Sequence, residues 1–151
     1  MPPPLFTSGQ IWKDDRYYLN TKTQQWERKY YLVMATSPDG SDALTAVFTS
    51  KPNGLTDDPA CSTGTPRAGH YVGIQGGFLV LESWVEFSSI KIVDSYLINQ
   101  QVGSGQTSLT VQTLPPALFC SVLRCALQVE LDISNRGIRW LRDTIAALNC
   151  P

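Results

Sequence analysis

Short apolar runs separated by turn residues occupy the first two thirds of the chain. Many of these runs are rich in β-branched and aromatic residues, and several alternate apolar and polar positions, which predicts strands. Turns are predicted at 20–23, 37–40 and 76–77, with a loop rich in proline and glycine over 51–69 and a loose, proline-rich lead-in over 1–8. The predicted strands are 9–12 with a continuation over 14–19 after a bend, 26–35, 44–49, 70–74, 78–81, 83–87 and 90–94, and the apolar residues 96–98 extend this region.

The spacing of apolar residues becomes helical after residue 105. A helix is predicted over 117–129, where the preceding prolines suit a first turn, and a second over 135–148. Its arginines fall largely on the face opposite the apolar residues, where a solvated role is more common than a phosphate contact. The sequence therefore predicts one α+β domain over 1–151: a small, strongly curled antiparallel β-barrel over 9–98, then a helical pair over 114–148.

The composition supports one folded domain and gives no overall attraction to nucleic acid. Hydrophobic residues make up 42% of the chain, and the formal net charge is −1 with a pI near 5.7. Any contact with RNA must therefore come from a local cationic patch. The N-terminal residues do not resemble an export signal, and no apolar run reaches the roughly 20 residues that span a bilayer. We expect a soluble, cytoplasmic protein without membrane contact.

The four cysteines are predicted to be thiols, as expected in a reducing cytosol. Cys120 and Cys125 are five residues apart in a predicted helix, so they point to different faces and do not suit a bond to each other. The spacing of Cys61, Cys120, Cys125 and Cys150 does not match the usual zinc motifs. We expect neither a metal site nor a cofactor.

Two predicted strands end in groups that bind anions. Arg28 and Lys29 stand at the start of the apolar run 30–34, and Thr49-Ser50-Lys51 follows the run 44–48. If the two strands are neighbours, a guanidinium, an ammonium and two hydroxyls converge on a site the size of a phosphate. Such a site can promote phosphate chemistry by positioning and electrostatics alone.

In order and spacing, these motifs resemble the MazF/PemK-like toxin family, whose compact SH3-like barrel is related to that of CcdB-type toxins. The resemblance covers residues 9–98 and the first C-terminal helix. The chain departs from the family pattern in having no proline after the basic pair, and in the added loop over 52–69 and second terminal helix. The motifs that carry the resemblance are Gly9-Gln10-Ile11-Trp12, Arg28-Lys29-Tyr30-Tyr31-Leu32-Val33, Val47-Phe48-Thr49-Ser50-Lys51 and Val85-Glu86-Phe87-Ser88-Ser89-Ile90-Lys91-Ile92-Val93-Asp94.

The resemblance implies a metal-independent endoribonuclease of a toxin–antitoxin system, forming a homodimer and neutralised by a cognate antitoxin protein. Arg28 or Lys29 would stabilise the charge on the reacting phosphate, and Thr49 with Ser50 would orient it. Whether Arg28 or Lys29 occupies the family's arginine position is open, and a lysine would lack the planar fork of a guanidinium. Single-stranded RNA would contact cationic and aromatic side chains, with Tyr18 a further candidate; the predicted RNA-binding residues are Trp12, Arg16, Tyr17, Trp26 and Lys51.

Proton transfer and the alternative functions are less defined by the sequence. His70, the only histidine, is a candidate acid or base, and an exposed bystander is its commoner role. Asp14, Asp15 and Glu27 are further candidate proton acceptors. The acidic pI and the missing proline favour the alternative of a noncatalytic barrel protein that acts through protein–protein contacts, as a CcdB-like inhibitor or a mobile-element adaptor.

Overall fold

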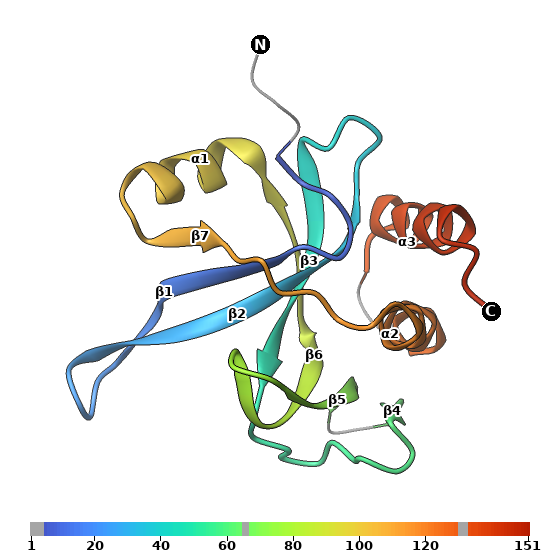
Figure 1. Cartoon of the computed structure of the whole chain (residues 1–151), viewed down its shortest axis with the longest axis horizontal. Helices are drawn as coiled ribbons and strands as arrows, with labels where there is room; N and C mark the ends of the chain where they lie inside the picture. The colour runs from blue at the N-terminus through green and yellow to red at the C-terminus, as the bar shows by residue number, and fades with distance from the viewer. Residues whose placement is uncertain (1–4, 65–66, 130–132) are drawn as a thin grey trace.

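The computed structural model describes residues 5–64, 67–129 and 133–151. In this part of the chain, seven strands form one antiparallel sheet in the order β4-β5-β6-β3-β2-β1-β7, with three helices around it (Figure 1). The elements are β1 (Ile11–Asn20), β2 (Gln25–Thr36), β3 (Asp42–Thr49), β4 (Cys61–Ser62), β5 (Gly69–Gln75), β6 (Leu79–Asp94), α1 (Ser95–Gly103), β7 (Thr107–Leu109), α2 (Pro116–Gln128) and α3 (Asn135–Ala147).

Most of the predicted elements are confirmed, with small shifts at their ends. The bend in the first strand is a register shift between Asp14 and Tyr18, and the three strands predicted between 78 and 94 are one strand, β6. The predicted extension of the β region over 96–98 is wrong, because Asp94 caps α1 by accepting a hydrogen bond from the amide of Leu97. The loose lead-in is wrong for Phe6, which is buried against Trp12; residues 1–4 lie outside the described part.

The sheet is open, so the predicted closed barrel is wrong. β4 and β7 form its two edges. Register shifts in several strand pairs increase the local twist, and the β2–β3 pairing stops at Tyr31 and Val47. Beyond that pair β2 stays with β1, whereas β3 stays with β6. The diverging strands leave β1 and β2 as a projecting arm, the β1–β2 ribbon (residues 15–28) (Figure 1).

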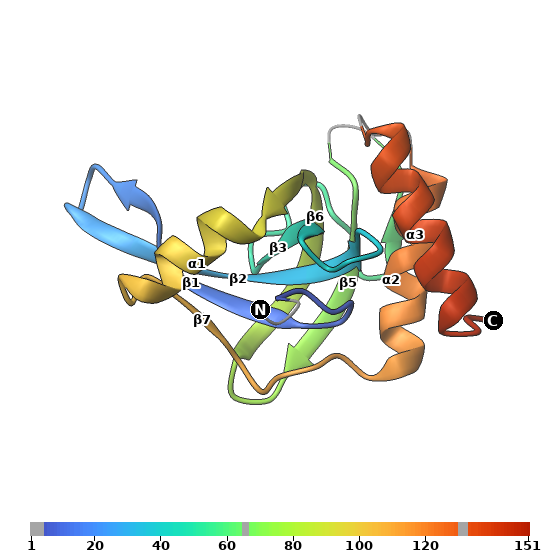
Figure 2. The same ribbon diagram turned by 90° about the horizontal axis from the view of Figure 1, so that it is seen from above.

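Helices cover both faces of the sheet. On one face α2 and α3 bury Leu123 and Leu141 against strand residues that include Leu32. On the other face Ile98 of α1 and Phe6 complete a second apolar cluster. Figure 2 shows the pair α2–α3 at one end of the molecule and the β1–β2 ribbon at the other. The point where β2 and β3 diverge therefore lies between the α2–α3 end of the molecule and the β1–β2 ribbon.

The predicted free thiols are wrong, because all four cysteines are paired in disulfides. Cys61 in β4 is bonded to Cys125 in α2, and Cys120 in α2 is bonded to Cys150 near the C-terminus. The Cα–Cα distances of 5.6 Å and 5.4 Å are usual for disulfides. Cys120 and Cys125 do point to different faces of α2, as expected, and each finds a partner far away in the sequence. The cysteine pairing is therefore set by the tertiary fold and not by the spacing of the cysteines in the sequence.

Candidate functional site

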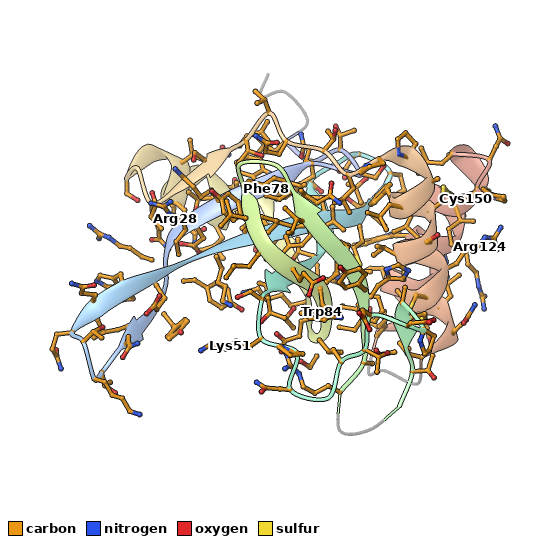
Figure 3. The ribbon with its side chains drawn as sticks, turned by 60° about the horizontal axis from the view of Figure 1, so that its bottom comes forward. Arg28, Lys51, Phe78, Trp84, Arg124 and Cys150 are labelled. Carbon is orange, nitrogen blue, oxygen red and sulfur yellow. A yellow bond between two sulfur atoms is a disulfide. The ribbon has the colours of Figure 1, made fainter. Side chains whose placement is uncertain are left out.

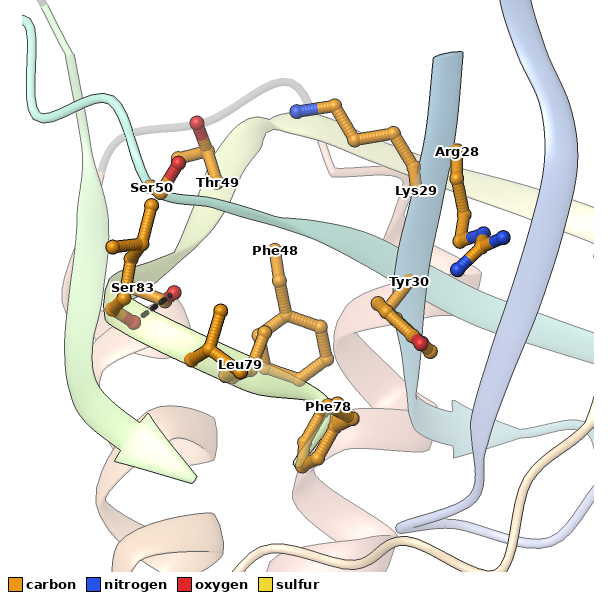
Figure 4. Close-up of a pocket in the computed structure, with 11 residues that line it drawn as sticks. Arg28, Lys29, Tyr30, Phe48, Thr49, Ser50, Phe78, Leu79 and Ser83 are labelled. Carbon is orange, nitrogen blue, oxygen red and sulfur yellow. Dashed lines mark hydrogen bonds between the residues drawn. The ribbon is translucent and has the colours of Figure 1, made fainter. Parts of the chain in front are cut away.

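A pocket opens where β2 and β3 diverge, and we call it the fork pocket (Figure 4). Its volume is about 180 Å³. Pockets for drug-sized ligands measure roughly 300–1,000 Å³, so this one suits a smaller group such as a phosphate. All four predicted catalytic residues line it, and the complete lining is Arg28, Lys29, Tyr30, Phe48, Thr49, Ser50, Phe78, Leu79, Val80, Leu81 and Ser83.

Lys29, and not Arg28, faces the hydroxyl groups. Continuing the pairing of Tyr31 with Val47 by two residues places Lys29 across from Thr49, on the same face of the sheet. Figure 4 shows Lys29 extending on the side of the Thr49 and Ser50 hydroxyls, whereas Arg28 leaves β2 on the other side. The Nε of Arg28 lies 2.9 Å from Oδ1 of Asp15, in an exposed ion pair on the β1–β2 ribbon. The geometry therefore assigns the inward-facing cation to Lys29.

The end of β3 presents two hydroxyls to the pocket, those of Thr49 and Ser50. Thr49 is buried, and its Oγ1 accepts a hydrogen bond of 3.2 Å from the amide of Lys51. This bond leaves the hydroxyl proton of Thr49 free to be donated. Ser50 is exposed beside it. An anion in the pocket can thus accept hydrogen bonds from the hydroxyls at the end of β3 and be attracted electrostatically by the ammonium of Lys29.

The opposite wall of the pocket is aromatic and apolar. The ring of Phe78 meets the rings of Tyr30 and Phe48 edge to face, with centroids 5.4 Å and 5.8 Å apart. Leu79 lies beside Phe48 (Figure 4). A pocket with one cationic, hydroxyl-bearing side and one aromatic side can hold a phosphate and contact a base at the same time.

Two charged residues near the pocket were not predicted from the sequence. Arg67, at the end of the long loop, forms a 2.7 Å ion pair with Glu86 of β6. The guanidinium also donates to the backbone carbonyls of Lys51 and Pro52, each at 3.3 Å. Glu86 occupies a polar position in the alternation of its strand, which is a weak signal, and no pattern in the sequence points to Arg67.

Burial lowers the pKa of Lys29 below its usual value. Glu86 and Glu27 oppose this by favouring the charged amine, whereas Lys51 and Arg67 add to the lowering. Lys29 therefore lies within reach of two further cations and two carboxylates.

The predicted RNA-binding residues divide into one buried and four accessible side chains. The prediction for Trp12 is wrong, because Trp12 is 4% exposed and packs on Phe6, where no base can stack on it. Arg16 and Trp26 are exposed on the β1–β2 ribbon, and Tyr17 is half-buried at its base with Lys91 over its ring. Lys51 is exposed where the chain leaves β3.

His70 does not belong to the pocket. It lies on β5, is 5% exposed, and its Nδ1 is 2.7 Å from the backbone carbonyl of Tyr71. Burial lowers its pKa, against the opposing effect of this hydrogen bond. A role in proton transfer at the fork pocket is therefore not supported by the geometry, and the expectation of an exposed bystander is also wrong.

Neither a metal centre in the described residues nor a match to a known protein identifies the site. Among the described residues, no three His, Cys, Asp or Glu side chains are grouped so that they could hold a metal ion. Of the helices in the described ranges, none is long and apolar enough to cross a membrane. No family model, curated protein or solved structure matches the chain. The resemblance to the MazF/PemK-like family thus stays a prediction, and the function must be argued from the pocket.

Proposed function

We propose that this protein binds single-stranded RNA at the fork pocket and cleaves it without a metal ion. The observation that carries the proposal is that Lys29, Thr49 and Ser50 line one small pocket that also has an aromatic wall. A backbone phosphate would bind the amine and hydroxyls, and an unpaired base would contact Tyr30 and Phe78. The exposed Trp26 and Arg16 would guide the strand along the β1–β2 ribbon.

In the proposed reaction the 2′-hydroxyl of the RNA attacks the neighbouring phosphorus, and the bond to the 5′-oxygen of the next nucleotide breaks. The attacking hydroxyl loses its proton to water, and the products are a 2′,3′-cyclic phosphate and a 5′-hydroxyl. Lys29 would stabilise the added negative charge, and Thr49 or Ser50 would orient the phosphate. The lowered pKa of Lys29 also suits it to donate the proton that the 5′-oxygen takes up.

The test is cleavage of a long single-stranded RNA by the purified protein in EDTA. Lys29→Ala should reduce the rate by about 10²-fold or more, because it removes the cation that faces the hydroxyls. Arg28→Ala is the matched control: it removes the adjacent charge, and we expect a change of less than about threefold, since that side chain is paired in solvent. Equal losses in the two variants would refute the assignment to Lys29.

A noncatalytic binding module is the second candidate. The pocket lining includes no histidine or carboxylate, and the Thr49 hydroxyl already accepts one hydrogen bond. Both features favour holding a phosphate over moving its protons. RNA binding that depends on Lys29, with no cleavage in the EDTA assay, would select this function.

The proposed partners follow from the resemblance and need separate tests. A cognate antitoxin and a homodimer are proposed for the ribonuclease, and sedimentation with and without RNA would measure the dimer. A cytoplasmic location is part of the same proposal. The two disulfides weigh against it, because such bonds persist mainly in oxidising compartments.

A further inference from the structure

We infer that Arg67, held by Glu86, is a positioning residue that fixes the end of β3, with Thr49, Ser50 and Lys51, at the rim of the fork pocket. The inference rests on the proposed function only for its effect on RNA. The position of the chain after β3 is set by contacts within the protein and does not depend on RNA.

The guanidinium joins three parts of the chain at one point. One of its nitrogens donates to the carbonyls of Lys51 and Pro52, directly after the strand end, and another forms the ion pair with Glu86. The side chain of Arg67 is 17% exposed and that of Glu86 is 22% exposed, so water competes weakly for their ion pair, whereas the bonds to the two carbonyls are exposed. A planar guanidinium makes these contacts from two separate nitrogens at once, whereas an ammonium presents its three donors from a single atom.

Glu86 is itself held in place. Its Oε1 accepts a 2.7 Å hydrogen bond from Ser88, and its strand position lies between Val47 of β3 and Gly69 of β5. A Cβ on Gly69 would lie 2.5 Å from the carbonyl oxygen of Val85, so the two strands approach closely at this point. Arg67 is therefore anchored to a closely packed part of the sheet, and through Arg67 this anchor also holds the backbone at Lys51 and Pro52 in place.

The same pair acts on Lys29 through its charges. The charged groups that act on the Lys29 amine are Glu86 on β6, Glu27 on β2, Lys51 after β3, and Arg67 before β5. Glu86 favours the protonated amine and Arg67 disfavours it. Neutralising one partner should therefore shift the titration of Lys29 in one direction, and neutralising the other should shift it in the opposite direction.

The experiment compares Arg67→Lys, Arg67→Gln and Glu86→Gln with the control Arg124→Lys. Arg124 donates to the carbonyl of Cys150 at the helical end, away from Lys51 (Figure 3). The probe is a labelled oligouridine with 2′-O-methyl groups, which the proposed reaction cannot cleave. We expect Arg67→Lys and Arg67→Gln to weaken binding by a similar factor of about five, with the salt slope of log K reduced by roughly 0.7 for one lost phosphate contact at Lys51. Arg124→Lys should match the wild type.

Two further readouts do not depend on RNA. Amide hydrogen exchange should speed up at residues 50–55 in Arg67→Lys, because the carbonyls of Lys51 and Pro52 lose the guanidinium donor. The titration of the Lys29 side chain, followed by NMR, should move to lower pH in Glu86→Gln and to higher pH in Arg67→Gln.

Each outcome decides between the alternatives. If Arg67→Lys binds like the wild type while Arg67→Gln does not, Arg67 contacts the phosphate through its charge and the positioning role is wrong. Unchanged exchange at residues 50–55, or shifts of Lys29 in the same direction in both variants, would also overturn it. If the wild type does not bind the probe but exchange and titration change as expected, the RNA proposal fails and the positioning role stands.

Discussion

Removing the Cys61–Cys125 disulfide should cost this protein a large part of its stability. The bonded residues are 64 apart in the sequence, and the chain-entropy relation gives about 4.3 kcal/mol for a loop of that length. The Cys120–Cys150 bond spans 30 residues and gives about 3.6 kcal/mol by the same relation. Domains of this kind are stable by only about 5–15 kcal/mol, so loss of both bonds would leave little margin.

The assay is urea denaturation of the wild type, Cys61→Ser with Cys125→Ser, and Cys120→Ser with Cys150→Ser. The double variants should have lower midpoints, with the 61–125 variant at least as destabilised as the 120–150 variant. The two loops overlap along α2, so the wild type treated with a reductant should lose less than the sum. Each variant also acts as the control for the other, because both remove two sulfur atoms that contact α2.

A loss below about 1 kcal/mol in the 61–125 variant would refute the reasoning, because it would place the stabilisation elsewhere. So would a clearly larger loss in the 120–150 variant, which closes the shorter loop. Counting thiols in the native protein without reductant checks the premise directly. All four cysteines should resist alkylation.

Three further predictions follow from single positions. Gly69→Ala should destabilise the protein by about 1–3 kcal/mol in urea, because its Cβ would lie 2.5 Å from a backbone oxygen, whereas Gly77→Ala, with no atom within 4 Å, should not clash. Trp26→Ala should weaken RNA binding in a filter assay without changing the thermal midpoint, while Trp12→Ala should cost about 3–5 kcal/mol, because Trp26 is 53% exposed and Trp12 is 4% exposed. Burial lowers the pKa of His70 below 6.5, so the folded state resists protonation of this side chain. The free energy of unfolding should therefore not depend on His70 above pH 6.5 and should fall as the pH drops below it. His70→Asn should flatten this slope in acid denaturation, and an unchanged slope would contradict the assignment.

The sequence pattern predicts the elements well where periodicity is strong. The helices α2 and α3 and the strands β1 to β3 follow directly from apolar spacing. That the basic pair 28–29 and Thr49 line one pocket follows from one further step, since a tight turn at 37–40 makes their strands antiparallel neighbours; the sequence leaves open which of the two cations faces Thr49. These are local properties, and local properties are what a single sequence displays.

Apart from the helix α1, which begins at a local cap on Asp94, the errors come from long-range geometry. Whether a curled sheet closes depends on register shifts, which alternation does not show. Trp12 and Trp26 both lie on strands, and only Trp12 is buried, in the apolar cluster that Phe6 and Ile98 of α1 complete. Four cysteines allow three pairings, and the fold alone brings Cys61 to Cys125.

The disulfides and the fork pocket place different demands on the protein. Both disulfides end on α2, while the pocket is lined by β2, the end of β3 and the turn into β6. The contacts of Arg67 with Lys51 and Glu86 tie the pocket rim to the sheet without involving α2. Reduction should therefore lower the free energy of unfolding while leaving the pocket intact in every molecule that stays folded.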